Sequence, residues 1–171
     1  MEGRRSILRE GVVAGVLGAT VVALWFLVVD VIAGHPLHTP EVLGRGLLGI
    51  FGRARSGIVD SGGDSALAVV SIYTLFHYLA FIVVGIIAAA IVRAGEREPS
   101  LLAGALILFV AIEIGFYGLT ALLAQTHVLG SLAWYQIGIA NLLAAAAMGV
   151  YLWRKHPALG QQLNYALQGR E

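Results

Sequence analysis

Asp30, His35 and His38 lie close together in the chain, in the stretch "DVIAGHPLHTP" at the end of a long apolar run. Imidazole nitrogens suit zinc or copper, and a carboxylate can complete such a ligand set. Together with His127, which follows a later apolar run, His35 and His38 form a candidate metal site. The alternative is a punctuated helix end, because the two prolines of the stretch would stop one helix and start another. The sequence has no HExxH motif and no cysteine, so nothing in it requires a metal or another cofactor.

A second group of polar residues lies inside the apolar runs themselves. Glu113 and Asn141 fall at the middle of their runs, and His77 falls within one turn of the middle of its run. An ionisable side chain near the centre of a bilayer costs at least about 2.5 kcal/mol, so it usually faces the protein interior and a partner. The expected intramembrane network, gathered in the outer half of the membrane, comprises Glu113, His77, Asn141, Gln136, Asp30, Tyr117 and Tyr73.

Two interpretations of this network stay open. Glu113 and His77 could form the floor of a polar pocket that opens to the outer side, or the network could only set how the helices pack. We expect a non-enzymatic membrane subunit or a bundle that binds a small ligand. The alternatives are a proton- or metal-linked transporter that uses Glu113 and His77, and a haem- or metal-bearing redox protein. Haem held by two histidines within the bundle is excluded, since only His77 lies in an apolar run. No phosphate loop or nucleophile motif favours an enzyme.

The composition of the chain is that of an integral membrane protein. Of its 171 residues, 58% are hydrophobic and only 12% are charged, and the mean hydropathy is +0.84. Soluble domains contain about 25% charged residues, so this chain has too few to cover a surface that faces water. The length fits one domain over residues 1–171, with the lipid bilayer as its main partner. The net charge is +1 and no basic block appears, so nothing in the charge suggests nucleic acid, and we expect no nucleic-acid partner.

Four apolar runs are long enough to cross a bilayer, which takes about 20 helical residues. They cover about 11–33, 66–92, 101–124 and 132–153. Backbone groups in lipid must bond within their own segment, which selects helices over strands. The fold class is therefore all-α, a bundle of four transmembrane helices.

Two shorter helices are expected outside the membrane core. Thr39 and Pro40 are typical of an N-cap and a first helical residue, and they begin a helix of about residues 40–52. Its apolar face would lie in the outer interface between the first two spans. The C-terminal tail carries Leu159, Leu163 and Leu167 at a spacing of four, which predicts a short amphipathic helix.

Lysine and arginine are distributed unevenly over the ends of the runs. Eight of them flank the ends that include both termini, and three lie in the first connection. Because cytoplasmic loops carry an excess of these residues, we expect both termini on the cytoplasmic side of a cell inner membrane. His156, beside Lys155 after the last run, is expected to be a solvated cation at a helix end.

Small residues recur along the first and last runs. They include Gly11, Gly15, Gly18, Ala140, Ala144, Ala145 and Gly149. Spacing of this kind lets helices approach closely. We expect it to serve packing within the bundle, while protein partners bound through these faces or through the C-terminal helix are the alternative.

Residues 11–49, with "LVVDVIAGHPLHTPEVLG" at their centre, resemble the N-terminal part of small uncharacterised bacterial four-span membrane proteins. In those proteins a polar residue ends the first helix, and a proline turn begins a short helix rich in leucine and glycine. The resemblance covers about a quarter of the chain. It implies a bacterial inner-membrane setting and no particular activity.

Overall fold

The computed structural model describes residues 2–53, 65–98, 100–103, 106, 109–110, 114, 134–158 and 160. Over these residues the chain forms helices and no strand, which confirms the all-α prediction for this part of the chain. The helices are α1 (Glu2–Ile32), α2 (His38–Arg53), α3 (Ala66–Gly95) and α5 (Trp134–Lys155). Three of them, α1, α3 and α5, are long and apolar enough to cross a membrane.

The boundaries differ from the predicted ones in a consistent way. Helix α1 begins at Glu2 rather than near Gly11, and α3 and α5 each run a few residues further than predicted, to Gly95 and Lys155. The hydrophobic pattern marks only the part of a helix that suits lipid, while backbone hydrogen bonds continue into the polar flanks. Most of the predicted span at 101–124, and the tail from residue 161, lie outside the described residues, so the fourth span and the C-terminal helix stay predictions.

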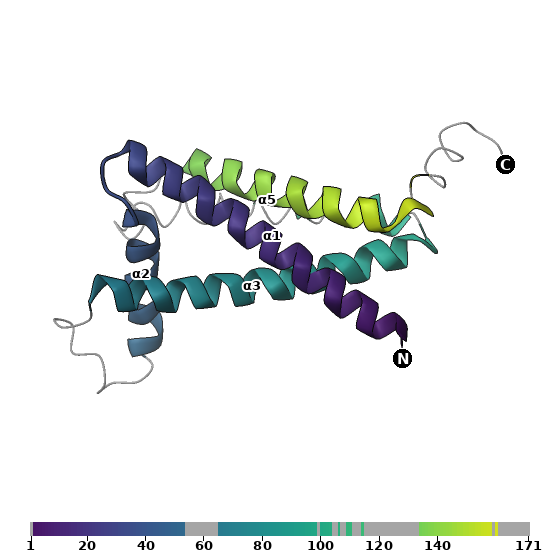
Figure 1. Ribbon diagram of the computed structural model, residues 1–171, viewed down its shortest axis with the longest axis horizontal. Helices are drawn as coiled ribbons and strands as arrows, with labels where there is room; N and C mark the ends of the chain where they lie inside the picture. The colour runs from purple at the N-terminus through teal and green to yellow at the C-terminus, as the bar shows by residue number, and fades with distance from the viewer. Residues whose placement is uncertain are drawn as a thin grey trace.

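Helices α1 and α3 cross at backbone contact. A Cβ added to Gly85 would overlap the carbonyl oxygen of Gly11 and the backbone of Gly15, and one added to Gly15 would overlap Phe81 and Ile82. Glycine is therefore required on both helices at the crossing. From this point the two helices diverge towards the end of the bundle that holds α2 (Figure 1).

Helix α5 packs along α1, and the end of α5 meets the end of α3 (Figure 1). A Cβ on Gly18 would meet the sulfur of Met148 at 2.6 Å, and Trp25 Nε1 donates to the carbonyl oxygen of Gln136 at 3.1 Å. The buried apolar side chains of the described core lie mainly along these two helices; those on α1 and α5 are Ala14, Ala19, Val22, Phe26, Ala140, Ala144, Met148 and Leu152. The small residues of α1 and two alanines of α5 thus serve packing within the bundle.

Helix α2 lies across the start of α3, roughly perpendicular to the long helices (Figure 1). The helix predicted at 40–52 is present, although it begins at His38. Gly44 is its contact point, because an added Cβ would lie 2.7 Å from Val69 Cγ1 and 3.2 Å from Tyr73 Cβ. A glycine that weakens an isolated helix is used here for a close crossing.

The turn from α1 into α2 follows from Gly34. Its φ is 80°, a left-handed backbone conformation that glycine adopts with little strain. The amide of Gly34 donates to the carbonyl oxygen of Val31, and that of His35 donates to the carbonyl oxygen of Asp30. These two bonds form a Schellman motif, which ends α1 and directs the chain back towards α3.

Candidate functional site

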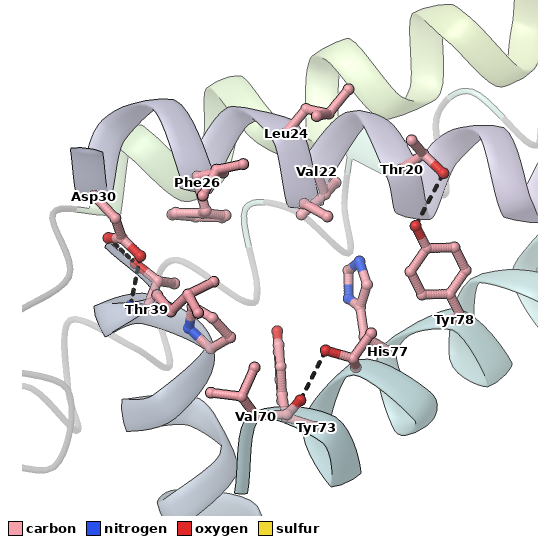
Figure 2. A pocket seen from close by; sticks show the side chains of 15 residues that line it. Thr20, Val22, Leu24, Phe26, Asp30, Thr39, Val70, Tyr73, His77 and Tyr78 are labelled. Carbon is pink, nitrogen blue, oxygen red and sulfur yellow. Dashed lines mark hydrogen bonds between the residues drawn. The ribbon is translucent and has the colours of Figure 1, made fainter. Parts of the chain in front are cut away.

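A cavity of about 220 Å³ lies where α1 and α3 diverge, and we call it the α1–α3 cavity. Helix α1 and α3 form its long walls, and the turn into α2 covers one end (Figure 2). The walls are mostly apolar. The side chains that carry polar groups are Thr20, Asp30, Thr39, Tyr73, Thr74, His77 and Tyr78.

His77 reaches from α3 towards α1 across this cavity (Figure 2). Its Nε2 lies 3.1 Å from the carbonyl oxygen of Ala19, so Nε2 carries the proton and donates. In the neutral ring, Nδ1 then holds a lone pair that can accept a hydrogen bond. The ring also packs against Phe81, with centroids 4.8 Å apart, which helps to hold its orientation.

Tyr73 lies one turn before His77, and the two rings are stacked with centroids 5.8 Å apart. The Tyr73 hydroxyl points into the cavity (Figure 2). Among the residues that the structure describes, no hydrogen bond of this hydroxyl is found. Tyr78 differs, because its hydroxyl lies 3.0 Å from Thr20 Oγ1 and closes the cavity on the other side of His77. Thr20 and Tyr78 were missed from the sequence.

Asp30 has a structural task at the α2 end of the cavity. It is only 4% exposed, and its two carboxylate oxygens accept from the Thr39 amide at 2.8 Å and the Thr39 hydroxyl at 2.7 Å. Thr39 was predicted to cap α2 as an acceptor. That prediction is wrong: Asp30 supplies the acceptor from α1, and a carboxylate is stabilised there by the positive end of the helix dipole.

The other predicted network residues are not brought together here. Gln136 and Asn141 lie on α5, which contributes no residue to the lining of the cavity. Glu113 and Tyr117 lie outside the described residues. The pairing of Glu113 with His77 therefore stays a prediction.

The candidate metal site is described only in part. His35 and His38 are both exposed, with ring centroids 6.3 Å apart. His127 lies outside the described residues. Within the part of the chain that the structure describes, no three His, Asp or Glu side chains are placed to hold a metal ion.

An ionic cluster around a buried histidine, at the opposite end of the bundle, was not anticipated. His156 is 7% exposed and lies between two carboxylates, with Nδ1 2.7 Å from Glu96 Oε1 and Nε2 3.0 Å from Glu10 Oε2. Glu10 also accepts from the Ser6 hydroxyl. The prediction of a solvated cation at His156 is wrong, because the ends of α1, α3 and α5 converge and bury the ring. We call this group the Glu10–His156–Glu96 cluster.

The hydrogen bonds of the cluster indicate its charge. A neutral imidazole has only one N–H, whereas His156 faces a carboxylate oxygen at each ring nitrogen. Both bonds form when the ring is an imidazolium that donates twice. The cluster therefore joins three helices through charge-assisted hydrogen bonds at the end that holds the start of α1.

Comparison of the chain with models of protein families, with curated proteins and with solved structures finds no match. Its function is therefore inferred from the α1–α3 cavity and from the apolar surface of α1, α3 and α5, which indicates a membrane protein.

Proposed function

We propose that the chain is a non-enzymatic membrane protein that binds a small, largely apolar ligand with one hydrogen-bonding group. The observation that carries this proposal is the α1–α3 cavity of about 220 Å³, beside a crossing packed to backbone contact. Pockets for drug-sized ligands measure about 300–1,000 Å³, so the ligand is smaller than these or inserts only one end.

The ligand would enter sideways from the bilayer. Leu24 and Leu27 line the cavity and are 56% and 40% exposed, so the cavity reaches the lateral surface of the bundle. In a membrane this surface faces lipid chains. The α2 end is covered by the turn that Asp30 and Thr39 hold in place. An apolar ligand therefore has a path from lipid that does not cross water.

Two polar atoms would orient the ligand. The Tyr73 hydroxyl can donate or accept, and His77 Nδ1 accepts while Nε2 donates to Ala19. A hydroxyl group on the ligand matches both, because it donates to one atom and accepts from the other. The rest of the wall is mostly apolar and suits a hydrocarbon body.

A matched pair of valine substitutions on α3 tests the proposal. Val70 lines the cavity, whereas Val83 is 56% exposed and does not. The full chain, purified in mild detergent, would be analysed by native mass spectrometry for bound small molecules. We expect wild type and Val83→Phe to carry the same ligand and Val70→Phe to lose it, because the added ring occupies the cavity.

A smaller change tests the polar contacts. Tyr73→Phe keeps the shape of the ring and removes its hydroxyl, so retention of the ligand should fall about tenfold, as for one lost hydrogen bond in a dry site. Melting temperatures of all variants check that they are folded. Equal ligand content in Val70→Phe and Val83→Phe, with both folded, contradicts the proposal.

The proposed setting is a bacterial inner membrane with four spans and both termini cytoplasmic. The bacterial part rests on the resemblance of residues 11–49 alone. The four spans are supported by the ends of the segment between α3 and α5. Glu96 is hydrogen-bonded to His156 at one end of the bundle, and the Gln136 carbonyl accepts from Trp25 towards the other end, so these two residues lie towards opposite ends.

The absence of native cysteine makes the topology simple to test. In intact cells an impermeant thiol reagent should label a cysteine introduced at Ser61 and should not label one at Ser100, since these positions flank opposite ends of α3. Labelling of Ser100 alone would reverse the proposed orientation. Labelling at both positions would contradict the span of α3.

A further inference from the structure

A second cavity lies beside the Glu10–His156–Glu96 cluster, at the end of the bundle away from α2. Its volume is about 430 Å³, and we call it the arginine cavity. Arg93 and Arg97 line it together with one carboxylate, Glu98, and its apolar lining includes Ile7, Ala90 and Leu101. The lining thus combines two cations and one anion with an apolar wall.

The two guanidinium groups are placed to act together. Arg93 and Arg97 are four residues apart, at the last turn of α3 and just beyond it, so they lie on one side of the chain. Arg97 is exposed, and Arg93 is half-buried near Glu10. Glu98, the carboxylate of the lining, accepts from the Ser100 hydroxyl at 3.5 Å. Guanidinium groups bind phosphate through paired hydrogen bonds, which makes phosphate the matching ligand group.

The surroundings of this cavity favour an anion attached to an apolar chain. The cluster brings the ends of α1, α3 and α5 together, so Arg9, Arg154 and Lys155 lie at the same end of the bundle. The positive charges of these three residues attract anionic membrane surfaces. The carboxyl end of α3 repels a bare anion, because the helix dipole is negative there. Contact of an apolar chain with Ile7, Ala90 and Leu101 offsets this repulsion.

We propose that the arginine cavity binds the phosphate of an anionic amphiphile, with Arg93 and Arg97 on the phosphate and the chain along Ile7, Ala90 and Leu101. This site is separate from the α1–α3 cavity and does not depend on the ligand proposed there. A membrane phospholipid and free phosphate share the recognised group. The apolar wall selects the phospholipid.

Charge-matched double substitutions test the site. Arg93→Gln with Arg97→Gln removes two cations inside the cavity, and Arg154→Gln with Lys155→Gln removes two at the same end but outside it. The full chain in neutral detergent would be titrated with phosphatidylglycerol, and binding followed by native mass spectrometry. We expect Kd to rise at least tenfold for the first pair and less than threefold for the second. Equal rises for both pairs would mean diffuse attraction only and would overturn the proposal.

Two further measurements keep the test decisive. Arg97→Gln alone removes an exposed side chain, so it leaves folding intact and should raise Kd about threefold to tenfold. If the double variant fails to fold, an unchanged Kd for Arg97→Gln overturns the proposal. Inorganic phosphate should bind at least a hundredfold more weakly than phosphatidylglycerol. If it displaces the lipid at equal concentration, the apolar wall has no role and the amphiphile assignment is wrong.

Discussion

Replacing His156 with alanine is the sharpest test of the bundle's architecture. The substitution removes two hydrogen bonds, of 2.7 Å to Glu96 and 3.0 Å to Glu10, from a ring that is 7% exposed. A hydrogen bond to a charged group contributes about 1.5–3 kcal/mol. The two carboxylates are 31% and 19% exposed, so water replaces part of what they lose. We therefore expect a loss of roughly 3 kcal/mol in the free energy of unfolding, near the lower bound for two such bonds.

The assay is reversible unfolding of the purified chain in mixed micelles, with helicity followed by circular dichroism as denaturing detergent is added. His35→Ala is the control, because His35 is exposed at the other end of the bundle and its loss should cost less than about 0.5 kcal/mol. Glu96→Gln should reduce the effect of His156→Ala, since the two residues share one bond. The reasoning is refuted if His156→Ala and His35→Ala destabilise the chain equally.

The remaining predictions concern packing and turns, and each is checked by the same unfolding assay. Gly85→Ala should lower the free energy of unfolding by about 3 kcal/mol, because the new Cβ overlaps backbone atoms of α1. Gly149→Ala is the control: a Cβ there has nothing within 4 Å, so this substitution should be neutral or stabilise the chain by up to about 1 kcal/mol. If both cost the same, the crossing is not as close as described. Gly34→Ala should cost about 1–2 kcal/mol, because φ is 80°; a neutral result would mean that the turn has another backbone conformation. Asp30→Ala should lower the free energy of unfolding by about 3 kcal/mol. In the Asp30→Ala background, Thr39→Val should lower it by less than about 0.5 kcal/mol more, because the hydrogen bond is already lost. Additive losses would show that the two residues do not act as a pair.

Much of the fold follows from local features of the sequence. Long apolar runs predicted α1, α3 and α5, since burying a polar backbone in lipid leaves only a helix. Apolar spacing predicted α2, and the glycines of α1 predicted a close crossing. The extent of the candidate site was less predictable. His77, Tyr73 and Asp30 line the α1–α3 cavity, but Thr20 and Tyr78 read as ordinary members of apolar runs.

The Glu10–His156–Glu96 cluster shows why the pairing of polar side chains could not be predicted from the sequence. Glu10 and Glu96 lie at the ends of apolar runs, where charged residues ordinarily meet water. The burial of His156 between them depends on how closely three helix ends converge. The convergence is set by the α1–α3 crossing at Gly15 and Gly85 and by the packing of Met148 against Gly18. Those contacts fix angles and registers that hydropathy does not encode.

The sequence by itself determined that this chain is helical and apolar enough for a membrane, because hydropathy and its period depend on neighbouring residues. Only the tertiary structure decided which polar groups meet. It paired Asp30 with Thr39 and joined His156 to Glu10 across 146 positions. A hydrogen bond forms only when two helices present donor and acceptor at one level and on facing sides. This geometry arises from helix crossings, which depend on contacts between segments far apart in the chain.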